Sequence, residues 1–242
     1  MKVHIIGIGM GPQHVTPEAA AALRACDYVV AAEKSGDDAL LALRREVADH
    51  YDLPVVAVPD PSRDREPVGD GGYVGAVADW HAARVAAYES VLAQRQGSAA
   101  FLVWGDPAFY DSTIRIIEAI AARGTVSVDY DVLPGISALQ LLAARHRIVL
   151  HDVGQPLHVT TGRRLGEAVD AGLTNIAVML NRTLRLDGLE EWRIWWGANL
   201  GRPEEALVAG RVRDVLEEIE SAREQVRAAT GWVMDIYLLQ AP

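Results

Sequence analysis

Residues 99–113 contain an apolar run that ends abruptly in a turn and passes into a helix-like pattern. The run 99–104 stops at Gly105-Asp106-Pro107, and isoleucines then recur at helical spacing from Ile114 to Ile120. Glycine lets the backbone turn sharply, proline fixes φ and removes a donor, and aspartate accepts hydrogen bonds from nearby amides. The stretch therefore predicts a buried strand, a tight turn and a helix, in an α/β fold that binds ligands at the carboxyl ends of its strands.

The same alternation recurs through the first half of the chain. Strands are predicted at 2–8, 28–32, 54–58, 99–104 and 126–133, and helices at 17–25, 38–49, 73–96 and 114–122. Thr16 followed by Pro17 is a typical helix start, with threonine as the N-cap and proline at the first helical position. Strands that alternate with helices favour a mainly parallel sheet.

Pro134-Gly135 interrupts this alternation and is the predicted hinge between a domain of residues 1–134 and a domain of residues 135–242. Beyond the hinge, strands are predicted at 156–160, 175–180, 191–197 and 231–239, with helices at 137–144, 164–171 and 213–227. Strands are denser here, and we expect this sheet to be partly antiparallel.

Composition excludes several classes of function. The formal charge of −10 argues against broad binding to nucleic acid, whose affinity depends largely on phosphate neutralisation. No apolar run approaches the roughly 20 residues that span a bilayer, and the N-terminus lacks a signal-peptide pattern. The single cysteine, Cys26, excludes an internal disulfide, agrees with a cytoplasmic location and is expected in the core. The histidine spacing predicts no metal site.

Two more loops follow predicted strands. The first, Ile6-Gly-Ile-Gly-Met-Gly-Pro12, does not match the dinucleotide pattern Gly-x-Gly-x-x-Gly, because Pro12 occupies its sixth position. It is either a loop that brings its backbone close to a ligand or a structural turn. The second, Leu133-Pro-Gly-Ile-Ser137, either offers free amides at a helix start or serves as an interdomain turn.

Together these loops resemble the tetrapyrrole (corrin/porphyrin) methylase family, two-domain α/β enzymes that use S-adenosylmethionine (SAM). The resemblance rests on Gly7-Ile-Gly-Met-Gly11, Trp104-Gly-Asp-Pro107 and Leu133-Pro-Gly-Ile-Ser137, with residues 175–180 and 199–205 in the places of later family segments. It implies a mainly parallel N-terminal sheet, a mixed C-terminal sheet, a SAM site in the cleft between the domains, and a homodimer. Residues 31–34, 105–118 and 231–239 are most similar to members that methylate C1 of precorrin-5 and release its acetyl group as acetate in cobalamin biosynthesis.

Carried to matching positions, the family's ligand roles imply a set of SAM contacts from both domains, with S-adenosylhomocysteine as product. These are Trp104, Gly105, Asp106 and Phe109, then Ser137 and Ala138, then Met179, Leu180, Asn199 and Leu200. The first loop would face the substrate through Gly9, Met10 and Gly11.

The implied chemistry has two parts. Methyl transfer from a sulfonium depends mainly on placing the acceptor carbon in line. Acetyl removal requires a nucleophile or general base and stabilisation of an oxyanion. Candidates are Glu33, Asp106, Asp111 and His14. Glu33 is preferred because it ends a predicted strand at the expected site, and the structural alternative for it is an ion pair with Lys34 or an arginine.

A corrin precursor with acetate and propionate arms predicts arginines at the site. The candidates are Arg44, Arg45, Arg63, Arg65, Arg163 and Arg164, of which we expect two or three at most to matter. The connector 60–72 is either a lid or a plain loop. Trp192, Trp195 and Trp196 either line the macrocycle or belong to the core and a dimer interface.

Three other functions fit the same residues. They are methylation at another ring position, methylation of RNA or of a modified histidine in a protein on the same fold, and binding of SAM without catalysis. Product mass, retention on RNA, and SAM binding without turnover distinguish them.

Overall fold

The computed structural model describes residues 1–34, 38–61 and 72–242. The chain divides into two compact units, Met1–Ser137 and Ala138–Pro242. The predicted boundary after residue 134 falls in the loop between the last strand of the first unit and the first helix of the second. Of the connector predicted at 60–72, residues 62–71 lie outside the described residues, and so do Arg63 and Arg65.

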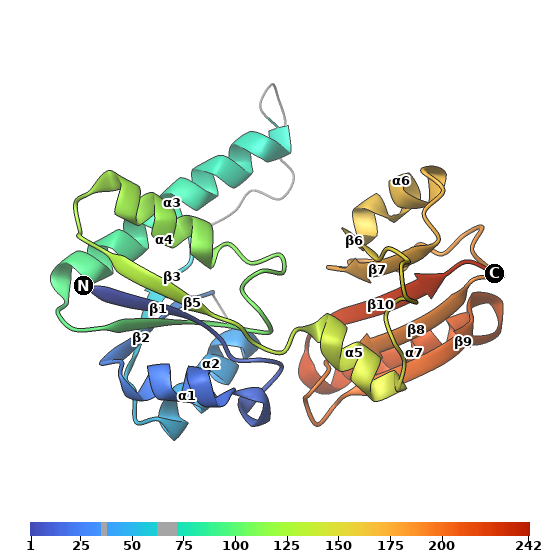
Figure 1. Cartoon of the computed structure of the whole chain (residues 1–242), viewed down its shortest axis with the longest axis horizontal. Coiled ribbons are helices and arrows are strands. Elements are labelled where there is room, and N and C mark those ends of the chain that lie inside the picture. Colours follow the sequence, from blue (N-terminus) through green and yellow to red (C-terminus); the bar gives the residue numbers. More distant parts are fainter. Residues whose placement is uncertain (35–37, 62–71) are drawn as a thin grey trace. The chain divides into compact units, whose positions relative to one another are not determined.

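Unit 1 is built on a five-stranded sheet with helices on both faces (Figure 1). The strand order is β3-β2-β4-β1-β5, and every neighbouring pair is parallel. The strands are β1 (Lys2–Gly7), β2 (Tyr28–Glu33), β3 (Val55–Pro59), β4 (Ala99–Val103) and β5 (Asp129–Leu133). All their carboxyl ends therefore lie at one edge of the sheet, where the three glycine-containing loops begin.

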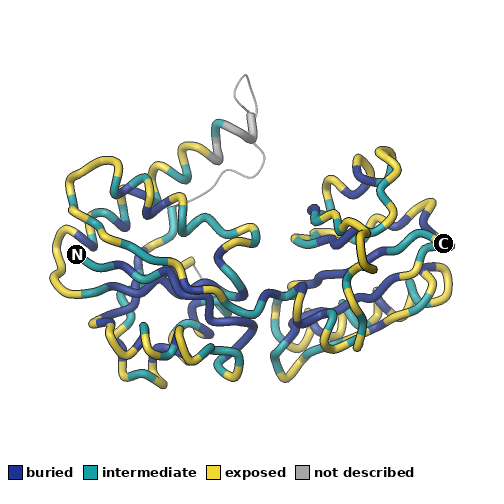
Figure 2. Tube along the Cα trace, viewed as in Figure 1, coloured by how far each residue is buried: buried dark blue, intermediate teal, exposed yellow. Residues whose placement is uncertain are grey.

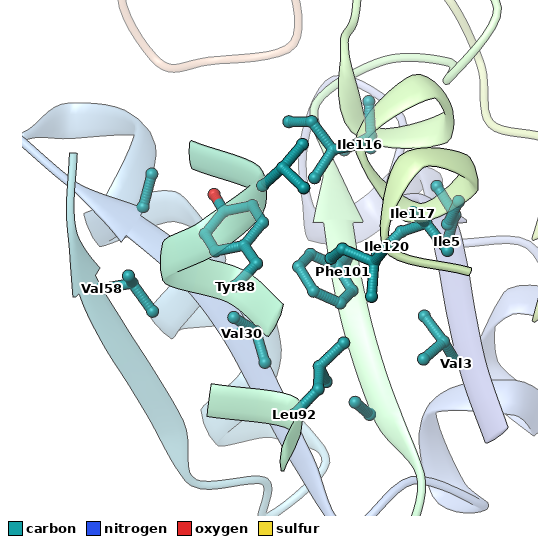
Figure 3. Close-up of a cluster of buried hydrophobic side chains, with 14 of the residues drawn as sticks. Val3, Ile5, Val30, Val58, Tyr88, Leu92, Phe101, Ile116, Ile117 and Ile120 are labelled. Atoms are coloured by element: carbon teal, nitrogen blue, oxygen red, sulfur yellow. The ribbon is translucent and has the colours of Figure 1, made fainter. Parts of the chain in front are cut away.

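The two faces of this sheet carry separate hydrophobic cores. On one face, α1 (Pro17–Arg24) and α2 (Ala39–His50) pack against side chains such as Ile6 and Leu102. On the other, α3 (Gly72–Gln94) and α4 (Thr113–Arg123) pack against the alternate residues of the same strands. Figure 3 shows Phe101 of β4 meeting Tyr88 and Leu92 of α3 and the isoleucines of α4. The alternation of side chains along a strand thus assigns each helix pair to its face.

Unit 2 contains a mixed five-stranded sheet of order β6-β7-β10-β8-β9, in which only β6 and β7 are parallel neighbours. Its strands are β6 (His158–Thr161), β7 (Asn175–Met179), β8 (Arg193–Ala198), β9 (Ala206–Arg211) and β10 (Asp235–Gln240). Its helices are α5 (Ala138–His146), α6 (Leu165–Asp170) and α7 (Val212–Thr230). Helices α6 and α7 share one core with the sheet, and Leu142 of α5 packs against Gly197.

Most predicted elements are present, with shifted ends. Thr16 caps α1 as expected, since its hydroxyl accepts from the Ala19 amide at 3.1 Å. Strand β9 was not predicted, because its apolar stretch, Ala206–Ala209, is short and is followed by Gly210 and Arg211. The predicted strand 231–239 begins only at Asp235. Figure 2 shows that both sheets are largely buried, whereas the helices keep an exposed side.

The structure also places the single cysteine and two of the tryptophans. Cys26 is buried in the core beneath α1, and burial raises the pKa of its thiol to about 11, so it is a core residue as expected. Trp196 is fully buried and Trp195 is 8% exposed, which places both in the interior of unit 2. No helix in the described part of the chain is long and apolar enough to cross a membrane.

Candidate active site

Two loops of unit 1 are joined through their backbones. Gly9, after β1, and Gly105, after β4, form a short antiparallel bridge. The Gly105 amide donates to the Gly9 carbonyl at 2.7 Å, and the Gly9 amide donates to the Gly105 carbonyl at 3.2 Å. Both residues have positive φ, +64° and +80°, a region that favours glycine. The glycine-rich loop and the Gly-Asp-Pro loop therefore form one continuous backbone surface.

The third loop approaches so closely that side chains are excluded. A Cβ added to Gly7 would lie 2.5 Å from the Gly135 amide nitrogen, and one added to Gly135 would overlap the Gly105 carbonyl oxygen. Such distances are shorter than real Cβ contacts allow. The glycines at 7 and 135 are thus explained by packing of backbone against backbone at the carboxyl edge of the sheet.

The Asp106 carboxylate holds this arrangement together. Its Oδ2 accepts from the Gly135 amide at 2.9 Å, and its Oδ1 accepts from the Ala108 amide at 2.8 Å. Both oxygens are therefore engaged with main-chain donors, one in its own turn and one in the loop after β5. This geometry gives Asp106 a role in positioning the loops, since each of its oxygens accepts from a main-chain amide.

The ligand contacts predicted in unit 1 lie close to Gly105. Ser137 and Met10 are buried, at 1% and 5% exposure. The nearest atoms to a Cβ built on Gly105 are the Met10 sulfur at 3.7 Å and the Ser137 Cα at 3.9 Å. Trp104 packs at the margin of the core beneath α1 and α2, and the Phe109 amide donates to the Asp106 carbonyl at 3.2 Å. The structure thus brings the predicted contacts of unit 1 together.

In unit 2, the predicted contacts also lie at one edge. Strands β7 and β8 run in the same direction, since each is antiparallel to β10 between them. Met179 ends β7, and Leu180 follows it with φ +55° and 51% exposure. Asn199 and Leu200 directly follow β8 and are buried at 0% and 1% exposure.

Asn199 has an unsatisfied donor. Its side-chain Oδ1 accepts from the Met234 backbone amide at 2.9 Å, and its backbone amide donates to the Met234 carbonyl at 2.9 Å. Its buried Nδ2 makes no hydrogen bond within the described residues. Buried amide donors are nearly always paired in folded proteins, so this atom fits a ligand that offers an acceptor at the carboxyl end of β8.

Residues 2–216 match the family described as Tetrapyrrole (Corrin/Porphyrin) Methylases. The chain belongs to the tetrapyrrole methylase family.

Comparison with individual proteins agrees with this family assignment. This methylase is 44% identical to a precorrin-6A synthase [deacetylating] of Sinorhizobium sp., with 99% of this chain and 95% of that protein covered. A crystal structure of a cobalamin-synthesis-related protein (CobF) from Corynebacterium diphtheriae is 36% identical and superimposes with a TM-score of 0.83, covering 99% of this chain and 98% of that one. A uroporphyrin-III C-methyltransferase from Thermus thermophilus, solved with S-adenosylhomocysteine, shares the fold at 17% identity, with a TM-score of 0.61 and coverage of 99% and 97%.

The family and fold predicted from the sequence are therefore confirmed. The prediction of a SAM-dependent methyltransferase of cobalamin biosynthesis is confirmed with them.

The acid–base candidates of this methylase lie in different surroundings. Glu33 ends β2, is exposed, and its Oε1 lies 3.8 Å from an Nη2 of Arg45. This is the ion pair that the sequence left as its alternative, and it is a loose one. Asp111 Oδ1 accepts from the Thr113 amide at 2.6 Å at the start of α4, which gives that carboxylate a structural task.

A buried network that the sequence did not reveal supports the edge of unit 2. The Asp235 side chain is 0% exposed, and its Oδ2 accepts from Nε of Arg223 at 2.8 Å and from Nε1 of Trp196 at 3.2 Å. Nη2 of Arg223 donates to the carbonyls of Asn181 at 3.2 Å and Arg182 at 3.0 Å. The arginine of α7 thereby holds the loop that carries Leu180. The sequence signal was an aspartate inside the strand predicted at 231–239.

Proposed function

We propose that this methylase transfers the methyl group of SAM to C1 of precorrin-5 and releases the acetyl group as acetate, giving precorrin-6A. The observation that carries the proposal is the 44% identity, over nearly the whole of both chains, to a protein named for that reaction. The wide coverage supports a shared activity, because the loops of both units are included.

The residues at the two edges fit SAM. Bound SAM supplies an electrophilic methyl group on a positively charged sulfur. The backbone at Gly105, where an added Cβ would meet nothing closer than the Met10 sulfur at 3.7 Å, suits close approach of a ligand. We propose that the methionine portion contacts Trp104, Gly105, Asp106, Phe109, Ser137 and Ala138, and the adenosine portion contacts Met179, Leu180, Asn199 and Leu200. The unpaired Nδ2 of Asn199 supports this assignment for unit 2.

The chain's own contribution to methyl transfer is positioning. The Gly9–Gly105 bridge and the two hydrogen bonds of Asp106 hold the loops rigidly, which favours in-line placement of the acceptor carbon. Gly9, Met10 and Gly11 contact the substrate in this proposal. Asp106 contributes in this proposal by holding the loops.

Acetyl removal requires a separate group. We propose Glu33 as the general base that activates water, because it lies at the carboxyl end of β2, is exposed, and keeps only a loose contact with Arg45. S-adenosylhomocysteine and acetate are then released with the methylated corrin. We further propose that the enzyme works as a cytoplasmic homodimer on a small-molecule tetrapyrrole, and the charge of −10 supports the absence of a nucleic-acid substrate.

Mass spectrometry tests this function. The protein is incubated with SAM and enzymatically generated precorrin-5, and the corrinoid product and free acetate are followed together. We expect the product to have exchanged acetyl for methyl, with one acetate released per turnover. Methylation without acetate would move the reaction to another ring position. SAM binding without any turnover would refute the proposed substrate.

A further inference from the structure

The sheet of unit 1 opens between two of its strands. Along β2 and β4 as described, pairing is confined to Tyr28 with Ala99 and Val29 with Ala100, although both strands continue to the carboxyl edge. On their outer sides both strands stay paired to their ends, β2 with β3 and β4 with β1. The opening therefore lies at the edge where the site loops begin.

Arg44 of α2 reaches this opening. Its Nε donates to the Leu102 carbonyl of β4 at 2.8 Å. The Val103 carbonyl accepts from the Ile8 amide on the β1 side. Successive residues of a strand direct their backbone groups to opposite sides, so the Leu102 carbonyl points toward β2. Arg44 thus satisfies a carbonyl that β2 leaves unpaired.

The described residues offer the rest of the guanidinium no partner. No carboxylate lies within 4 Å of Arg44 in residues 1–34, 38–61 and 72–242, and its two Nη groups make no hydrogen bond there. Burial lowers its pKa, and the charges of Asp111 and Asp38 act on it only from a distance. Both carboxylates are bound by backbone amides, Asp38 by those of Leu40 and Leu41 at 3.1 Å and Asp111 by that of Thr113 at 2.6 Å.

Other arginines that the sequence offered for carboxylate binding have a carboxylate of the chain within 4 Å. Arg164 makes two hydrogen bonds to Glu167, at 2.9 Å and 2.7 Å, and Arg45 faces Glu33. A half-buried guanidinium without a contacting anion is less stable than one paired with a carboxylate, because no ionic contact offsets the cost of removing it from water. The geometry therefore distinguishes Arg44 from these neighbours.

We propose that Arg44 binds a carboxylate arm of the corrin substrate through its two Nη groups. The proposal rests on the proposed function, which supplies a substrate with acetate and propionate side chains. A guanidinium presents parallel N–H donors that match the two oxygens of a carboxylate. The Nε bond to Leu102 holds this fork in one orientation beside β4, the strand that leads into the Gly-Asp-Pro loop.

Four proteins test the role of Arg44: the wild type, Arg44→Met, Arg44→Lys and Arg24→Met. Arg24 is a matched control, because it is an exposed arginine in the last turn of α1, at the opposite edge of the sheet. For each, the KM for precorrin-5, the Kd for SAM and the thermal midpoint are measured at low and moderate salt. We expect Arg44→Met to raise KM by about 10- to 100-fold, as for loss of a hydrogen bond to a charged group, with the Kd for SAM within about twofold. Arg44→Lys should recover part of the loss, and the control should match the wild type.

Salt dependence separates binding from a structural role. An ionic contact makes KM rise with salt, so the salt dependence of KM should be weaker in Arg44→Met than in the control. A KM within about twofold of the wild type would overturn the proposal, and so would parallel losses of SAM affinity, midpoint and KM. If the wild type does not turn over precorrin-5, the proposed function fails. Binding of uroporphyrin III, a stable tetrapyrrole with eight carboxyl groups, then decides on Arg44 alone: weaker binding by Arg44→Met supports it, and equal or absent binding overturns it.

Discussion

Removing the arginine of the buried pair in unit 2 should be strongly destabilising. Arg223→Met leaves the Asp235 carboxylate, which is 0% exposed, without its cation. Loss of one partner of a buried ion pair costs about 3–5 kcal/mol, mainly because the remaining charge is desolvated and uncompensated. The Trp196 donor at 3.2 Å stays, so we expect the lower part of this range, about 3 kcal/mol.

The predicted loss can be measured by thermal and urea unfolding followed by circular dichroism. For a chain of this size, each kcal/mol shifts the midpoint by about 2–4 °C, so a loss of about 3 kcal/mol corresponds to roughly 6–12 °C. Arg211→Met is the matched control, because it removes an arginine from an exposed ion pair with Glu191. Such surface pairs contribute only about 0–1 kcal/mol.

A double variant tests the physical cause. Arg223→Met combined with Asp235→Asn removes both charges, so the unpaired buried carboxylate disappears, and we expect the double variant to be more stable than Arg223→Met alone. The reasoning is refuted if the two single losses simply add, or if Arg223→Met costs no more than the surface control. Because Arg223 also holds the carbonyls of Asn181 and Arg182, Arg223→Met should weaken SAM binding as well.

Three further substitutions, with one control in unit 2, test the site residues of unit 1. Gly135→Ala should reduce SAM affinity and cost about 1–3 kcal/mol, because its methyl group would overlap the Gly105 carbonyl. Both variants are compared by calorimetric titration with SAM and by thermal melting. Gly166→Ala is the control and should be neutral or stabilising, because it is a helical glycine with nothing within 4 Å of an added Cβ. Equal effects of Gly135→Ala and Gly166→Ala would contradict the packing described for Gly135. Asp106→Ala should abolish SAM binding, since both of its oxygens hold loop amides, and an unchanged Kd would remove it from the site. Glu33→Gln should slow acetate release more than methyl transfer in single-turnover assays, whereas equal effects on both steps would argue against a general base.

Local signals in the sequence were sufficient for the elements of unit 1. Apolar runs five or six residues long, separated by helical patterns, are typical of buried parallel strands with helices on both faces. The Thr16–Pro17 pair marked the start of α1 because capping depends on residues three positions apart. The order of the three glycine-containing loops was enough to indicate the family.

Only the tertiary structure decided what those loops do. The Asp106 carboxylate meets the Gly135 amide across 29 positions of sequence, and Arg223 meets Asp235 across 12, separations at which no local pattern predicts a partner. Strand β9 also depends on its pairing with β8, since its own apolar stretch is short and ends at a glycine.

The arginines show the same division most clearly. The family resemblance predicted several arginines as candidates for substrate binding and could not rank them, because a guanidinium is the same group wherever it occurs in a sequence. Burial and pairing differ from one to the next, and these depend on which strands part and which carboxylates already have donors. The sequence by itself determined that this chain is a methylase of two α/β units with arginines near its strand ends. The fold decided that Arg44 is held at an open strand edge, with no carboxylate beside it among residues 1–34, 38–61 and 72–242.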